Sequence, residues 1–106
     1  MITSGQDDHG VRMTETRLTL AGHDVFVEEW EPQTVTDPRP ITFVHGLAGS
    51  TATWLLVAAP IAAALGRRVI ALDLAGFGRT TAPDDGATLD VNTAIVRDLA
   101  DEIGPT

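Results

Sequence analysis

Two short glycine-containing stretches have residue types and spacing that could form a ligand site. "HGLAGS" at residues 45–50 and "DLAGFG" at residues 73–78 each follow directly after a four-residue run with the character of a buried strand. Glycine at the end of a strand leaves the backbone bare, so that other groups can approach it closely. Open α/β sheets bind their ligands at the loops that leave the carboxyl ends of parallel strands. Both stretches are therefore predicted to lie where such a sheet places a ligand.

Nucleotide binding is the first function to test against these stretches. A dinucleotide-binding fingerprint requires G-x-G-x-x-G opening a helix. Gly76 and Gly78 supply the first two glycines, but Thr81 occupies the third position and no helix is predicted to open there. A phosphate-binding P-loop requires a lysine, and the chain contains none. Both nucleotide-binding motifs are excluded by the residues that they require.

The pattern of apolar residues predicts the elements that carry the two loops. Residues 41–44 and 69–72 are continuous rather than alternating apolar runs, which suits parallel strands covered on both faces. The Ala-rich segment between them, residues 53–65, is predicted to be helical, with Pro60 either kinking the helix or lying in its first turn. Strand, helix and strand in this order form a βαβ unit, whose crossover is expected to be right-handed.

Further elements are predicted on both sides of this unit. Residues 16–20 and 25–30 have strand character and are separated by the turn residues Gly22, His23 and Asp24, which indicates a β-hairpin. Towards the C-terminus a helix is predicted, with Thr88 as its N-cap and Gly104 at its end. One face of that helix collects its apolar residues, which are Val91, Ile95, Val96, Leu99 and Ile103.

The N-terminal stretch differs in character from the rest of the chain. Residues 1–13 are mostly polar and have no hydrophobic period, so we expect a disordered leader there and a folded domain over residues 14–106. Met1 and Met13 are both candidate start residues. The leader has neither the positive flank nor the apolar core of a signal peptide. The longest apolar run, residues 55–65, is shorter than the ~20 residues of a membrane-spanning helix. We therefore expect a cytoplasmic protein.

Composition narrows the classes of partner and cofactor. The 106-residue chain carries a net charge of −8, its basic residues are all arginine, and they form no cluster, so we expect no nucleic-acid or anionic membrane partner. It has no cysteine, which excludes disulfides, thiolate metal ligands and a cysteine nucleophile within these residues. We expect no cofactor and no bound metal.

The order of motifs resembles that of one enzyme family. A hairpin, a strand, "HGLAGS", a downstream tryptophan, a helix, "RVIALDLAGFGRT" and a second helix are together similar to the N-terminal part of an α/β-hydrolase. The resemblance covers residues 14–104. It implies an α/β fold with an incomplete hydrolase sheet, in which the family strand order is 1-2-4-3-5. It also implies that the complete protein hydrolyses an ester or a related bond through a nucleophile–His–acid triad.

The resemblance also implies roles for individual residues. In this family the loop after the third strand supplies half of the oxyanion hole, whose backbone N–H groups stabilise the negative charge that acyl transfer develops on oxygen. That donor is expected to be the backbone N–H of Leu47, with Gly46 at the turn leaving room for the substrate. Leu47, Gly46 and Trp54 are expected to contact the substrate, although Trp54 also suits the core. Structural roles in the two loops are expected for His45, Asp73, Gly76 and Gly78.

The triad itself is not present in these residues. The family requires a nucleophile on a sharp turn, as in G-x-S-x-G or a counterpart with Asp or Cys, and the serines Ser4 and Ser50 do not fit it. Ser50 is instead expected to cap the first helix. Three interpretations stay open: a truncated hydrolase, one half of a split enzyme, or a small non-catalytic α/β binding module. The substrate and the type of nucleophile are not determined, and the chain alone is predicted to be inactive.

The family strand order carries a consequence for the sheet edge. The strand at residues 41–44 would lack its neighbour, the fifth strand, and it contains no charged residue to discourage pairing. Apolar positions such as Val91, Ile95 and Leu99, and the Ala-rich first helix, are expected to lose cover as well. The isolated chain is therefore expected either to self-associate through the edge of Ile41–Val44 or to remain partly molten, and the net charge opposes aggregation. The oligomeric state itself is not determined.

Overall fold

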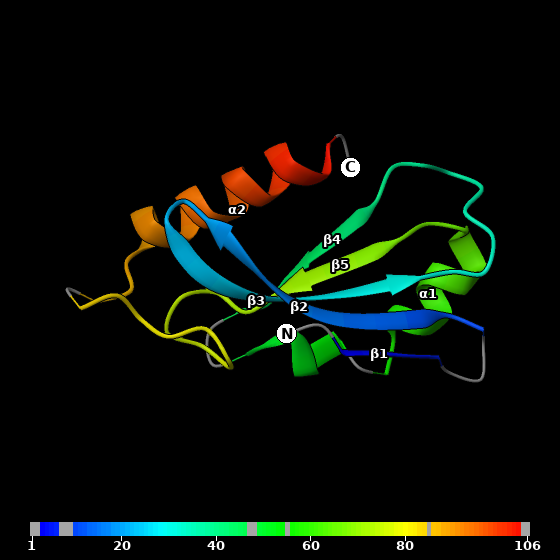
Figure 1. The fold of residues 1–106 in the computed structure, drawn as a ribbon, viewed down its shortest axis with the longest axis horizontal. Helices are drawn as coiled ribbons and strands as arrows, with labels where there is room; N and C mark the ends of the chain where they lie inside the picture. Colours follow the sequence, from blue (N-terminus) through cyan, green and yellow to red (C-terminus); the bar gives the residue numbers. More distant parts are fainter. Residues whose placement is uncertain (1–2, 7–9, 47–48, 55, 85, 105–106) are drawn as a thin grey trace.

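A computed structural model describes residues 3–6, 10–46, 49–54, 56–84 and 86–104 of the chain. Figure 1 shows one twisted sheet with helices on either side. The elements, in chain order, are β1 (Thr3–Gln6), β2 (Arg12–Leu20), β3 (His23–Glu31), β4 (Ile41–Val44), the 3₁₀ helix η1 (Thr51–Trp54), α1 (Ala58–Leu65), β5 (Val69–Leu72) and α2 (Leu89–Ile103).

The described strands form one mixed sheet in the order β1-β2-β3-β5-β4. β4 is parallel to β5, with Ile41 opposite Val69, whereas the other neighbouring pairs are antiparallel. The predicted βαβ unit and the hairpin beside it are confirmed. So is the family order 1-2-4-3, which β2, β3, β5 and β4 follow in space. β4 therefore lies at one edge of the described sheet.

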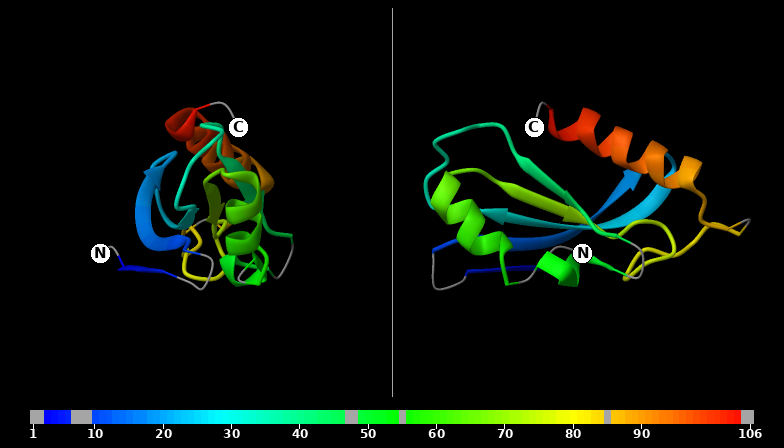
Figure 2. Two further views of the ribbon diagram at one scale, coloured as in Figure 1. Left: turned by 90° about the vertical axis from the view of Figure 1, so that its right-hand side faces the viewer. Right: turned by 180° about the vertical axis from the view of Figure 1, so that it is seen from behind.

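The two α-helices cover opposite faces of the sheet, as the end-on view in Figure 2 illustrates. Alternate residues of β5 point to opposite faces, because side chains alternate along a strand. Ile70 and Leu72 belong to the buried cluster under α2, while Val69 and Ala71 belong to the cluster under α1. Each loop that leaves β4 or β5 is thus anchored between two packed layers.

The hairpin is longer than the sequence indicates. β2 and β3 have nine residues each, and the turn between them consists of Ala21 and Gly22, with φ of 50° and 80°. Positive φ at both central residues matches the two-residue turn that best suits the twist of a hairpin. His23 and Asp24, expected in the turn, are the first residues of β3 because each pairs across the ladder with a residue of β2.

The structure also differs from the expected disordered leader. Residues 3–6 form β1, which pairs antiparallel with residues 12–15 of β2, so part of the leader and its boundary at residue 13 belong to the sheet. Val11 is fully buried in the cluster under α1. Backbone pairing along an open edge needs no hydrophobic period, which explains why the pattern of residues 1–13 did not reveal the strand.

The first helix is divided into two. η1 precedes α1, and Pro60 is the third residue of α1, which confirms the second of the two positions foreseen for it, the first helical turn. Proline is tolerated there because the first N–H groups of a helix have no partner within it. The N-cap of α1 is Val57, without a side-chain cap, so the prediction that Ser50 caps this helix is wrong.

α2 begins and ends where the sequence indicates. The side chain of Thr88 accepts a hydrogen bond from the N–H of Val91 at 3.1 Å, which confirms the predicted N-cap. Ile95 and Leu99 are buried, so the expectation that they lose cover is wrong. They pack against the hairpin and β5, which lie within the described residues and cover them. No helix among the described residues is long and apolar enough to cross a membrane.

Candidate active site

His45 links the carboxyl end of β4 to the loop that follows β5. The residue is 4% exposed, and its Nε2 accepts a hydrogen bond from the N–H of Leu74 at 3.0 Å. Because a backbone N–H can only donate, Nε2 carries no proton, and Nδ1 is then the atom that donates to the carbonyl oxygen of Gly46 at 2.8 Å. The ring also packs edge-on against Phe77, with centroids 5.2 Å apart. These contacts hold the two glycine-containing loops side by side.

Gly46, predicted to lie at the turn after the strand, follows the end of β4 and is exposed. A Cβ added to Gly46 would meet no atom of the described chain within 4 Å. The carbonyl oxygen of Gly46 accepts a second hydrogen bond, from the N–H of Gly49 at 3.0 Å. Gly49 is crowded by contrast, since a Cβ there would lie 3.0 Å from Cβ of His45. Leu47, the predicted oxyanion donor, lies outside the described residues.

Asp73 organises the second loop. It is 1% exposed, and its Oδ2 accepts a hydrogen bond from the N–H of Arg79 at 2.8 Å. Gly76 and Gly78 both have positive φ, 86° and 51°. A Cβ on Gly78 would lie only 2.3 Å from Oδ2 of Asp73. The loop can therefore close around the carboxylate of Asp73 only because residue 78 is glycine.

Two side chains that sequence reasoning did not assign to the site also hold the second loop. The side-chain amide of Asn92, in α2, accepts a hydrogen bond from the N–H of Ala75 at 2.8 Å. The hydroxyl of Thr80 accepts from the N–H of Phe26 in β3 at 2.9 Å. Elsewhere in the fold, Asp98 of α2 accepts a hydrogen bond from the N–H of Ala21 in the hairpin turn at 2.7 Å. A polar residue such as Asn92 beside an apolar helix face was the available signal, because asparagine is not a favoured residue inside helices.

Trp54 lies on the α1 face of the sheet. Its ring packs on Phe43 of β4 with centroids 4.7 Å apart, and it is half-buried against the cluster under α1. Its indole Nε1 is buried and has no hydrogen-bond partner among the described residues. This placement corresponds to the core alternative that the sequence allowed for Trp54.

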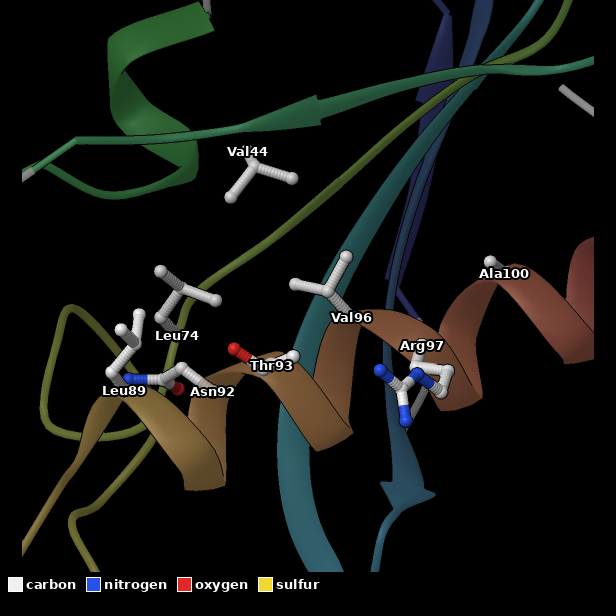
Figure 3. Close-up of a pocket in the computed structure, with 8 residues that line it drawn as sticks. All are labelled: Val44, Leu74, Leu89, Asn92, Thr93, Val96, Arg97 and Ala100. Atoms are coloured by element: carbon white, nitrogen blue, oxygen red, sulfur yellow. The ribbon is translucent and has the colours of Figure 1, made fainter.

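An apolar groove of about 480 Å³ lies on the opposite face, between β4 and α2. Figure 3 shows Val44 on one side and residues of α2, among them Thr93 and Val96, on the other. Leu74, from the loop after β5, forms part of its lining. Among the described residues that line the groove, neither Gly46 nor Trp54 is found. The groove is therefore adjacent to the two loops but is not the pocket that the sequence indicated.

The fold is an open α/β sheet, and the two glycine-containing loops at the carboxyl ends of β4 and β5 are joined by the hydrogen bond from Leu74 to His45. The comparisons with known proteins agree with this class of fold. The model of the alpha/beta hydrolase family matches residues 43–106. A curated relative, "Probable lysophospholipase BODYGUARD 3" from Arabidopsis thaliana, is 35% identical over 65 residues, which are 59% of this chain and 13% of that protein.

Solved structures give the same result. The thioesterase domain from the curacin biosynthetic pathway is 26% identical, with a TM-score of 0.72 over 87% of this chain and 33% of that one. An epoxide hydrolase from Vigna radiata superposes with a TM-score of 0.73 at 22% identity, over 94% of this chain and 30% of that one. The chain belongs to the alpha/beta hydrolase family, and it spans about a third of the length of these similar structures.

Proposed function

We propose that residues 41–104 supply the oxyanion-hole side of a hydrolase site for an ester or a related bond. The nucleophile, the acid and the base are provided by polypeptide outside the 106 residues. Family membership supports the reaction class, and the name of the curated relative, a probable lysophospholipase, is consistent with an ester substrate. The epoxide hydrolase among the similar structures supports the fold and leaves the substrate open.

The observation that carries the proposal is the bridge from His45 to Leu74. By joining the carboxyl ends of β4 and β5, it fixes the backbone next to Gly46, where the free space beside that residue leaves room for a substrate carbonyl. A preorganised N–H aimed at developing charge needs such a rigid support, because a donor that must reorient gives little stabilisation. In this proposal Leu47 donates its N–H to the oxyanion, and His45 is a positioning residue rather than a proton carrier.

The remaining site residues have supporting roles in the proposal. Asp73, Gly76 and Gly78 shape the second loop, which carries Leu74 and Phe77 against the ring of His45. Trp54 packs on Phe43 of β4 and forms part of the wall of the proposed substrate pocket on the α1 face. In this proposal none of these residues acts as the nucleophile, so the chain stabilises a charge through Leu47 without starting the covalent step.

The first test is turnover of an activated acetate ester by the purified chain. We expect no rate above background, because a donor without a nucleophile has no covalent step to stabilise. Removing one donor from a complete site costs roughly 10²–10³ in rate. A rate that survives purification and falls more than tenfold in Leu47→Pro, which lacks the N–H, would contradict the proposal.

Reading the coding DNA beyond codon 106 distinguishes the three interpretations. A strand followed by G-x-S-x-G or G-x-D-x-G after this point supports a truncated hydrolase. The same motif in a neighbouring gene supports a split enzyme, and activity should then appear when the two products are mixed. Its absence from both supports a binding module and refutes the proposed hydrolase function.

A further inference from the structure

Arg79, in the loop that follows β5, is held by the hairpin through both its backbone and its side chain. Its carbonyl oxygen accepts a hydrogen bond from Nη2 of Arg17 in β2 at 2.6 Å. Its guanidinium pairs with the carboxylate of Glu15, also in β2, and lies over the ring of Phe26 in β3, with Cζ 4.6 Å from the ring centroid. In the sequence Arg79 is 62 residues from Arg17 and 64 from Glu15, so these contacts join distant parts of the chain.

The strand register places the partners of Arg79 on one face of the sheet. Arg17 lies directly opposite Phe26 in the ladder between β2 and β3, and the residues on either side of Phe26 belong to the cluster under α2. The ring of Phe26 and the side chains of Arg17 and Glu15 therefore lie on the opposite, α1 face. Glu15 is itself opposite Glu28, and two such glutamates repel when both are charged. The guanidinium of Arg79 offsets that repulsion, which gives this position a physical reason to hold a cation.

The loop that carries Arg79 is fixed at both ends to the same residue of β3. The N–H of Asp73 donates to the carbonyl oxygen of Phe26 at 3.0 Å, and the N–H of Phe26 donates to the hydroxyl of Thr80 at 2.9 Å. The N–H of Thr80 donates in turn to the carbonyl oxygen of Phe77 at 3.0 Å, which closes a tight turn with Arg79 as one of its two central residues. The conformation of Arg79 therefore helps to set the position of Phe77.

The same loop reaches the first glycine-containing loop through the ring of His45. Phe77 lies edge-on to this ring, with centroids 5.2 Å apart, and the N–H of Leu74 donates to its Nε2 at 3.0 Å. Nδ1 of the ring donates to the carbonyl oxygen of Gly46 at 2.8 Å. A continuous path of contacts thus runs from the hairpin through Arg79 and its loop to the backbone at Gly46.

We propose that Arg79 is a positioning residue for the oxyanion side of the site, and that Glu15 and Phe26 hold its guanidinium in place. The importance of this position for a reaction rests on the proposed function, whereas the coupling of Arg79 to His45 is a property of this chain. The side chain of Arg79 is 63% exposed, and an ion pair so exposed adds little to the stability of a fold. Its removal should therefore loosen the bond between Leu74 and His45 more than it loosens the sheet.

The test compares Arg79→Ala with Arg12→Ala in the full 106-residue chain. Both arginine side chains are 63% exposed and pair with a glutamate, but Arg12 pairs with Glu31 within the hairpin and on the opposite face of the sheet. Amide hydrogen exchange of Leu74 is measured relative to that of Val27 in β3, which has a strand on each side, so that a change in global stability cancels. We expect this ratio to rise about tenfold in Arg79→Ala, through loss of the ion pair and the cation–π contact, and to stay unchanged in Arg12→Ala.

The ring of His45 supplies a second readout, which a purely structural role of Arg79 would not move. Nδ1 carries the proton in the folded chain, so the ring nitrogens of the neutral imidazole should show the NMR shifts of a single tautomer. In Arg79→Ala the two shifts should move towards each other, because a ring with a weakened bond from Leu74 exchanges its tautomers. Arg79→Lys keeps a cation that can reach Glu15 and the ring of Phe26. It should restore both the single tautomer and the slow exchange of Leu74.

Three results would overturn the proposal. Equal acceleration of exchange at Leu74 and Val27 in Arg79→Ala would show that Arg79 only stabilises the fold. An equal rise of the ratio in Arg12→Ala would show a general effect of losing a positive charge. A lysine variant that behaves like the alanine variant would show that the cation is not what holds the loop. No esterase assay enters this test, so failure of the proposed reaction leaves its result unaffected.

Discussion

Gly78→Ala is the substitution for which the structure makes the sharpest prediction. The added Cβ would lie 2.3 Å from Oδ2 of Asp73, more than an ångström inside ordinary van der Waals contact, at a residue whose φ is +51°. Asp73 is 1% exposed and cannot move outwards freely. We therefore expect its carboxylate to shift and lose the 2.8 Å hydrogen bond from the N–H of Arg79.

The expected magnitude follows from two costs. A left-handed conformation costs a non-glycine residue about 1–2 kcal/mol. Loss of a hydrogen bond to a buried charged group costs about 1.5–3 kcal/mol. Together they amount to roughly 2.5–5 kcal/mol, a large part of the 5–15 kcal/mol typical of a small domain. Gly22→Ala is the matched control, since Gly22 has φ of +80° and no atom within 4 Å of an added Cβ, so that only the conformational cost applies.

The free energy of unfolding can be measured by urea denaturation with tryptophan fluorescence as the signal. We expect Gly78→Ala to be destabilised about 1.5–3 kcal/mol more than Gly22→Ala. In an Asp73→Ala background this difference should disappear, because the obstructing carboxylate is gone. Equal destabilisation by the two glycine substitutions, or a difference that persists without Asp73, would refute the reasoning.

Three further outcomes are expected. Gly46→Ala should leave the free energy of unfolding of this chain unchanged, because its Cβ meets nothing; in a completed hydrolase it should lower kcat, and equal activity would contradict the assignment of that space to substrate. Thr88→Ala should lower the free energy of unfolding by about 1 kcal/mol in urea denaturation, because α2 loses its N-cap. Thr93→Ala is the control, since it makes the same substitution within α2 at a threonine that is not the N-cap. The guanidinium of Arg39, hydrogen-bonded to Asp37, holds the pKa of that carboxyl well below its ordinary value. The stability that this ion pair gives to the folded chain is therefore complete above the ordinary Asp pKa of about 4 and is lost as the pH falls towards the lowered pKa. In Arg39→Gln, the pKa of Asp37, measured by NMR titration of its carboxyl group, should rise towards the ordinary value. An unchanged pKa would contradict this cause.

Much of the fold was predictable because its signals are local. The continuous apolar runs of β4 and β5 reflect burial on both faces, and they indicated a parallel pair before any partner was known. The start of α2 was predictable from Thr88, since a cap acts within three residues of itself. The strand at residues 3–6 was missed, because pairing at an edge leaves no hydrophobic period.

The candidate site was predictable in type and only partly in detail. The glycines and Asp73 could be recognised as loop residues, because their special backbone geometry is a local requirement. Asn92 was marked as a polar residue within a helix, but its partner, the N–H of Ala75, could not be recognised, because nothing near Asn92 in the sequence indicates that contact. The α2 residues that line the groove, among them Leu89, Val96 and Ala100, were likewise not recognised as a set, because the core-facing residues of the same helix give the stronger apolar pattern.

The sequence by itself determined the elements, their caps and turns, and the class of fold, since these depend on propensities and hydrophobic periods over a few neighbouring residues. Only the tertiary structure decided which distant groups meet. The ring of His45 reaches the N–H of Leu74 across 29 positions, and the carboxylate of Asp98 reaches the N–H of Ala21 across 77. Such hydrogen bonds depend on the order of strands in the sheet and on the face that each helix covers. Neither is encoded at short range, because the same local pattern of strands and helices is compatible with more than one topology.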